Sequence, residues 1–220
     1  MTQGRQGRQR LLIAAALLIP VALVTGCQGG DGAALSLSGL TETADGMPDD
    51  GADTCPLPYD VAEAAEAAGL DGAAAGTGSV ADEGEPVATA EGGKRAEPGS
   101  GLAENPGVLV SCSFHIGKED VEVHTVATRS PAAIAPLAPV VQSLSGAPLD
   151  DLSTYLQRAG DAKAGDVVVT DSGNVAAVRL ALDGDGDAYL LVGVGEAGDG
   201  APDRTRQVAG LAEALAGQVG

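Results

Sequence analysis

Large aromatic side chains and positive charge are both scarce in this chain of 220 residues. It has no tryptophan, one phenylalanine and three tyrosines, and it carries 12 basic residues against 31 acidic ones. A core that lacks large aromatics must be small and packed mainly by Val, Leu and Ala. The net charge of -19 repels phosphate groups, so the composition disfavours nucleic acids and anionic lipid headgroups as partners.

Long hydrophobic runs are absent as well. The apolar stretch Leu11 to Val24 is interrupted by Pro20 and follows three arginines, at positions 5, 8 and 10. It is shorter than the ~17 to 25 apolar residues of a membrane-spanning helix. A basic segment followed by a short apolar one is typical of a secretory signal. We therefore expect residues 1–26 to be a signal peptide.

The end of this stretch, Val24-Thr25-Gly26-Cys27, resembles the lipobox of bacterial lipoproteins. The resemblance implies that the chain is cut before Cys27 and that Cys27 becomes lipidated, with palmitate or a similar acyl chain. Two acyl chains are enough for stable attachment. The expected location is the extracytoplasmic side of the cell membrane, reached through this lipid.

Cysteine is rare too, and its odd number is informative. Of the three cysteines, one needs an explanation in an exported protein, and lipidation of Cys27 supplies it. Cys55 and Cys112 then remain as a disulfide pair in an oxidising compartment. The alternative is that both are buried, reduced thiols.

Two segments are poor in apolar residues. Residues 28–54 hold six acids and no base, so we interpret 27–54 as a disordered acidic tether. A second low-complexity stretch, at about 71–106, is interpreted as an insertion on the surface of a single disulfide-bonded domain, residues 55–220.

Local patterns predict the elements of that domain. Residues 108–116 alternate between apolar and polar, as a half-buried strand does, and Gly117-Lys118 suits a two-residue turn into a second strand over 119–128. This turn predicts that Phe114 faces Val121 and Cys112 faces Val123. Further elements are expected as follows: helices at 58–68, 140–144, 149–159 and 202–217, and strands at 167–170, 175–182 and 188–194.

The order α-β-β-α-β-β-β-α favours the α+β class. We expect an antiparallel sheet of about five strands with helices packed on one face. The motifs Cys55-Pro-Leu57 and Cys112-Ser-Phe114, after a lipobox, resemble those of small actinobacterial lipoproteins of unknown function. That resemblance implies the same disulfide and the same fold class, and it implies no activity.

The predicted hairpin also places polar groups together. Ser111 lies opposite His124, and Glu122 is on the same face, so a hydrolase site can be drawn from a hydroxyl, an imidazole and a carboxylate. The sequence has no nucleophile elbow and no glycine-rich oxyanion loop near them. We therefore favour a solvated strand face and no catalytic residues.

Metal binding has little support. The run Asp183-Gly-Asp-Gly-Asp187 imitates the start of a calcium loop, but Ala188 replaces the glycine and Val194 the glutamate that such a loop needs. A hairpin turn explains the run better. His115 and His124 are too far apart along the hairpin to share an ion. No metal or cofactor is expected.

Together these patterns predict a monomeric, membrane-anchored lipoprotein with a non-enzymatic binding or accessory role in the cell envelope. Its expected partner is an envelope protein or a small ligand. The alternatives are a small hydrolase that uses Ser111, His124 and Glu122, or a carrier of a small ligand.

Overall fold

The computed structural model describes residues 35–70, 75–77 and 86–220. The chain divides into two units, residues 1–31 and 32–220, and all the described residues belong to the second. The expected signal peptide and Cys27 therefore lie outside the described residues. Within the described ranges, no helix combines the length and the hydropathy that crossing a bilayer requires.

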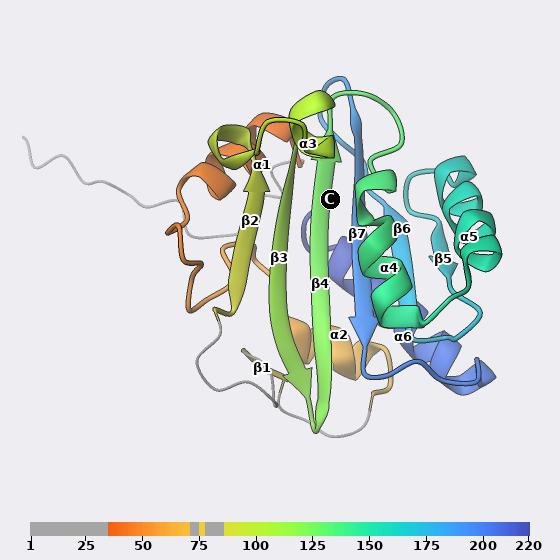
Figure 1. The fold of residues 1–220 in the computed structure, drawn as a ribbon. Coiled ribbons are helices and arrows are strands. Elements are labelled where there is room, and N and C mark those ends of the chain that lie inside the picture. The colour runs from red at the N-terminus through yellow and green to blue at the C-terminus, as the bar shows by residue number, and fades with distance from the viewer. Residues whose placement is uncertain (1–34, 71–74, 78–85) are drawn as a thin grey trace, which may run out of the picture. The chain divides into compact units, whose positions relative to one another are not determined.

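An antiparallel sheet forms the centre of this unit (Figure 1). Its main order is β1-β3-β4-β7-β6-β5, and β2 pairs with β3 beside β1. The strands are β1 (Ala75–Thr77), β2 (Ala88–Gly92), β3 (Gly107–Ile116), β4 (Glu119–Thr128), β5 (Val167–Val169), β6 (Val175–Arg179) and β7 (Asp187–Val194). The α+β class and the antiparallel sheet expected from the sequence are confirmed, with two short strands added at the edge formed by β3.

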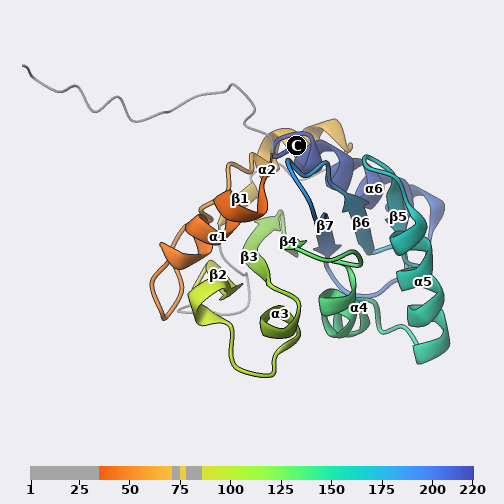
Figure 2. The same ribbon diagram turned by 90° about the horizontal axis from the view of Figure 1, so that it is seen from above.

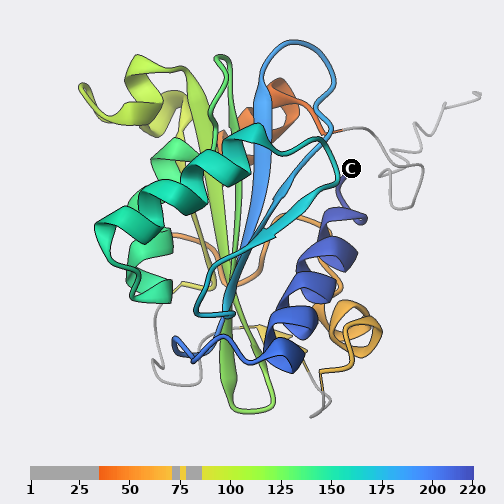
Figure 3. The same ribbon diagram turned by 90° about the vertical axis from the view of Figure 1, so that its right-hand side faces the viewer.

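Helices cover the sheet on both sides (Figures 2 and 3). They are α1 (Leu37–Asp45), α2 (Val61–Ala67), α3 (Gly101–Glu104), α4 (Ala138–Ser145), α5 (Leu149–Asp161) and α6 (Pro202–Ala216), with short 3-10 turns η1 (Gly93–Arg95) and η2 (Ala135–Leu137). Helices α1, α2 and α6 share one apolar core with the sheet. On the other face, α3, η2, α4 and α5 contribute to a second core. Beyond the expected helical layer, the structure thus has a second one.

The β3–β4 hairpin has the predicted register. Phe114 pairs with Val121 and Cys112 with Val123, and Gly117 has a φ of 64° in the turn. A residue with a Cβ rarely adopts that conformation. The turn glycine therefore sets the register that brings Ser111 opposite His124.

The predicted disulfide between Cys55 and Cys112 is present. Their Cα atoms are 5.5 Å apart across a sequence separation of 57 residues. Cys55 precedes α2, and Cys112 is buried in β3. The bond thus attaches the segment that leads into α2 to the centre of the sheet.

The tether predicted over 27–54 is wrong from Leu35 onward. Ser36 caps α1 by accepting a hydrogen bond from the Gly39 N–H at 3.1 Å, and Leu40 and Ala44 of this helix are buried in the core. The apolar residues here are few, but they recur every three or four positions and so lie on one helical face. That face packs on the sheet.

The prediction of a surface insertion over 71–106 is also wrong for the described residues 75–77 and 86–106, which form part of the sheet edge and its connections. Strand β2 pairs with β3 from Ala88 opposite Cys112 to Gly92 opposite Val108, and α3 follows it. At Gly92 the chains approach so closely that a Cβ would lie 2.2 Å from the carbonyl oxygen of Gly107. The low-complexity sequence of this segment is therefore explained in part by packing, because the close approach of β2 to β3 requires small residues.

Candidate functional site

The structure brings Ser111, His124 and Glu122 into one hydrogen-bonded chain. The Nδ1 atom of His124 is 2.8 Å from the Ser111 Oγ, and its Nε2 atom is 3.1 Å from the Glu122 Oε2. His124 is 7 % exposed, whereas the Glu122 side chain is 44 % exposed. The predicted proximity of the three residues is thus observed, with the imidazole between hydroxyl and carboxylate.

The surroundings of this chain lack what acyl transfer requires. Ser111 lies on β3 between Thr89 of β2 and His124 of β4, so strands border its backbone on both sides. Donors for an oxyanion must be free and must converge beside the nucleophile. A groove on this face is lined by Glu122, Leu144 and Arg204, but Ser111 and His124 are not among its lining residues.

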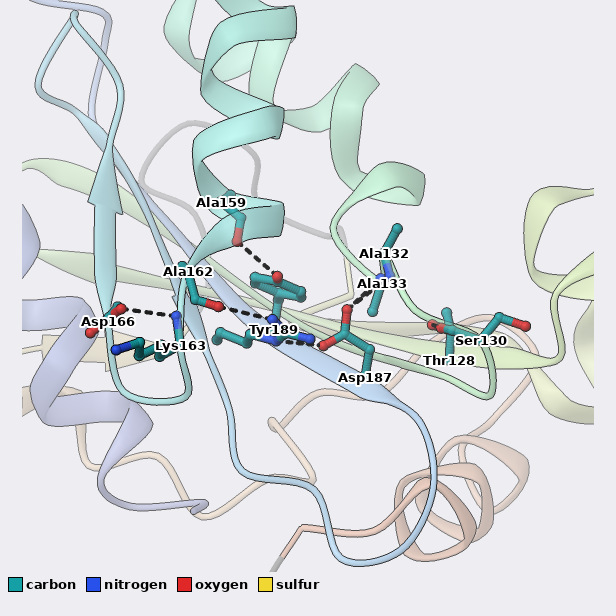
Figure 4. Close-up of polar contacts among 11 residues, drawn as sticks. Thr128, Ser130, Ala132, Ala133, Ala159, Ala162, Lys163, Asp166, Asp187 and Tyr189 are labelled. Atoms are coloured by element: carbon teal, nitrogen blue, oxygen red, sulfur yellow. Dashed lines mark hydrogen bonds and ion pairs between the residues drawn. The ribbon is translucent and has the colours of Figure 1, made fainter.

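The acidic turn between β6 and β7 is used internally. The carboxylate of Asp187 is 3 % exposed and lies 2.9 Å from the Nε of Arg179. Its other oxygen accepts hydrogen bonds from the backbone N–H groups of Ala132 and Ala133, at 2.9 and 3.1 Å. Figure 4 shows Ala132 and Ala133 beside the carboxylate of Asp187. Both oxygens of Asp187 are therefore committed to donors, which argues against the calcium-loop interpretation.

The same cluster holds two segments in place. Ala132 has a φ of 72°, unusual for a residue with a Cβ, and successive N–H groups turned in this way form a small anion-binding nest. Arg179 also donates to the carbonyl of Ala162 at 2.9 Å, and its guanidinium carbon lies 5.9 Å from the centre of the Tyr189 ring. The cluster ties the ends of β6 and β7 to the loop before η2 and to the end of α5.

Metal ligands do not gather in the part of the chain that the structure describes. No group of three or more His, Cys, Asp or Glu side chains there is arranged to hold a metal ion. His115 pairs with Asp120, and His124 with Ser111, along the hairpin. The two imidazoles thus occupy different positions in the strand register.

Comparisons with known proteins identify no relative of the chain. It matches no protein-family model, and no match was found among the curated proteins or the solved structures.

A groove between α1 and α3 was not predicted from the sequence. It holds about 790 Å³ and has apolar walls that include Leu37, Leu102 and Pro106. We call it the α1–α3 groove. Its lining comes from four separate segments of the chain, which only the folded topology brings together, so no local motif could have indicated it.

Charged side chains of both signs line the α1–α3 groove. The side chains of Arg129, Glu42 and Asp183 line it, and all three residues are exposed. No described residue forms an ion pair or a hydrogen bond with any of these side chains. The hydroxyls of Ser36, Ser38 and Thr41 add polar groups on the α1 side. The arrangement suits a ligand that carries an apolar part and both charges.

Burial raises the pKa of each of the three tyrosines above its usual value of about 10. The hydroxyl of Tyr59 is 2.5 Å from the Thr125 Oγ1, and that of Tyr189 donates to the Ala159 carbonyl at 2.8 Å. The hydroxyl of Tyr155 is buried and has no hydrogen-bond partner among the described residues. Tyr155 thus differs from the other two.

Proposed function

We propose that this chain is an extracytoplasmic lipoprotein, anchored to the membrane through Cys27, whose α+β domain is a non-enzymatic binding module. The observation that carries the binding role is the α1–α3 groove. Its volume of about 790 Å³ falls within the ~300 to 1,000 Å³ range of small-molecule sites. The disulfide supports the compartment, because such bonds persist outside the reducing cytosol.

The ligand that best fits this groove is a small amphipathic zwitterion. The Arg129 guanidinium offers donors to an anionic group, and the carboxylates of Glu42 and Asp183 offer acceptors to a cationic one. The apolar walls would cover a hydrocarbon part of the ligand. A purely anionic ligand fits less well, because the residues from Cys27 onward have a net charge of -22 once the three arginines before Cys27 are left out.

The anchor has a direct test. Replacing Cys27→Ala should abolish incorporation of a fatty-acid probe and release the protein from the membrane fraction. The matched control is Cys55→Ala, which removes the disulfide but should leave labelling intact. Continued labelling of the Cys27→Ala chain would refute the anchor.

The binding role is tested with a zwitterionic lysophospholipid below its critical micelle concentration. Replacing Arg129→Ala should weaken binding about 10- to 100-fold, because a hydrogen bond to a charged group contributes about 1.5–3 kcal/mol. Arg206→Ala is the control, since Arg206 is exposed on α6 and pairs with Asp203. Equal affinities of the Arg129→Ala and wild-type proteins would count against the groove.

A second candidate function rests on the Ser111–His124–Glu122 chain. Its two contacts, 2.8 and 3.1 Å, are within the reach that nucleophilic catalysis needs. A panel of ester and peptide substrates tests it, together with a fluorophosphonate probe for a reactive serine. The binding-module proposal expects no turnover and no labelling. Turnover that disappears in both Ser111→Ala and His124→Ala would establish the hydrolase instead.

A further inference from the structure

A second cavity lies between α4, α5 and the connection that follows β5. It holds about 250 Å³, and its lining includes Leu152, Tyr155 and Arg158 of α5 together with Thr170 and Ser172. We call it the α4–α5 cavity. It shares no lining residue with the α1–α3 groove, so the two are separate sites.

The distinctive feature of the α4–α5 cavity is Tyr155. This side chain lines the cavity, is 2 % exposed, and holds the one buried side-chain polar atom without a hydrogen-bond partner in the described part of the chain. A buried hydroxyl that has lost water and gained no partner destabilises the fold. A phenylalanine would fill the same space without that penalty. The presence of a tyrosine at this position therefore calls for an explanation, and a ligand in the cavity that hydrogen-bonds to the hydroxyl would provide one.

The charges around Tyr155 indicate the class of ligand. The guanidinium of Arg158 pairs with Asp171 at 3.8 Å and donates to the Val169 carbonyl at 3.1 Å. It lines the cavity together with Tyr155, and its positive charge disfavours an ammonium group beside it. The carboxylates of Asp151, Asp171 and Asp199 also line the cavity and disfavour an anion. A neutral ligand avoids both conflicts.

A hydroxyl-rich ligand can form hydrogen bonds with the polar side chains that line the cavity. Each hydroxyl donates one hydrogen bond and accepts others, so it can donate to the Asp151 carboxylate and accept from the Arg158 guanidinium. Burial raises the pKa of the Tyr155 phenol, so the phenol stays neutral and can itself donate and accept. A volume of about 250 Å³ suits one sugar ring better than a longer molecule, since sites for larger ligands occupy ~300 to 1,000 Å³.

We propose that the α4–α5 cavity binds a neutral polyol of monosaccharide size and that the Tyr155 hydroxyl is its buried hydrogen-bond partner. This site is additional to the α1–α3 groove, and it does not depend on the zwitterion proposed there.

The test titrates the purified, isotope-labelled full-length chain with D-glucose, D-mannose and myo-inositol at millimolar concentration and follows the amide spectrum. At least one of these probes should shift the signals of residues 145–158 and 170–172. Tyr155→Phe should weaken that binding about tenfold or more, because the buried phenol loses its hydrogen bond to the ligand.

Tyr189→Phe is the matched control, because the Tyr189 hydroxyl donates to the Ala159 carbonyl and does not line the cavity. It should keep the affinity of the wild type while lowering the melting temperature. Tyr155→Phe without ligand should melt at the wild-type temperature or above it, which shows that it folds.

Two results would overturn the proposal. The first is that none of the three probes shifts the cavity signals, which would mean that water alone occupies the cavity. The second is that Tyr155→Phe binds as tightly as the wild type. Neither result bears on the α1–α3 groove, whose own test is the Arg129→Ala variant.

Discussion

At the scale of single residues, Asp187 holds the loop before η2 to the sheet. Its carboxylate is almost fully buried and receives the Arg179 side chain and two backbone N–H groups. Asp187→Ala removes the acceptor and leaves all three donors without it. Breaking a buried ion pair in this way costs about 3–5 kcal/mol. We expect a loss of that size in the free energy of unfolding measured by urea denaturation.

Asp185 provides the control for this prediction, because it lies in the same turn but is exposed and has no described partner. Asp185→Ala should change stability by less than about 0.5 kcal/mol. Equal effects of the two substitutions would show that the turn tolerates the loss of the Asp187 network. The sequence could not distinguish the two aspartates, because the partners of Asp187 come from residues 132–133 and 179 and become neighbours only in the fold.

At the scale of elements, the disulfide attaches the segment before α2 to β3. A cross-link over a separation of 57 residues stabilises by about 4 kcal/mol in the chain-entropy model. The double substitution Cys55→Ala with Cys112→Ala should lower the free energy of unfolding by about that amount. The wild type after reduction is the control, because it loses the same constraint without a cavity at Cys112. If the free energy of unfolding changes by less than about 1 kcal/mol in both the double variant and the reduced wild type, α2 and α6 hold this segment in place without the disulfide.

Local signals decided which elements could be predicted. The β3–β4 hairpin was predictable because a two-residue turn and strict alternation act over neighbouring residues. Helix α1 was not predictable from the sequence, because Gly39, Thr41 and Thr43 have low helix propensity. It is helical because Leu40 and Ala44 pack on the sheet, and tertiary packing of this kind outweighs propensity in short helices.

At the scale of the whole domain, the same distinction applies to the candidate sites. Ser111 and His124 could be placed together because one turn connects their strands. The α1–α3 groove and the α4–α5 cavity could not be predicted, because each is lined by segments that only the complete topology brings together. The tyrosines illustrate the point, since nothing around Tyr155 in the sequence reveals that its hydroxyl lacks a hydrogen-bond partner among the described residues.

The three tyrosines also predict how the whole domain responds to alkaline pH. The pKa of each is raised in the folded state, so the unfolded chain releases these protons near pH 10 while the folded protein retains them. The stabilisation is complete below pH 10 and is lost as the pH rises toward the folded pKa values. Each proton that the folded state retains lowers the free energy of unfolding by about 1.36 kcal/mol for every pH unit above the unfolded pKa. Tyr59 and Tyr155 carry the large shifts and keep their protons beyond pH 11, so these two alone should lower the free energy of unfolding by about 3 kcal/mol between pH 9 and pH 11. Tyr189, whose pKa is raised as well, adds to this loss.

Urea denaturation across this range measures the slope, and the ultraviolet absorbance of tyrosinate reports ionisation in the same samples. We expect tyrosinate to appear together with unfolding. Tyr59→Phe should reduce the slope by about 1.4 kcal/mol per pH unit, because it removes one titrating group with a strongly raised pKa. This comparison does not depend on the stability that the variant loses with the Thr125 hydrogen bond. Tyrosinate that forms well before the domain unfolds would contradict the raised pKa values, and it would show that water reaches the phenols in the folded state.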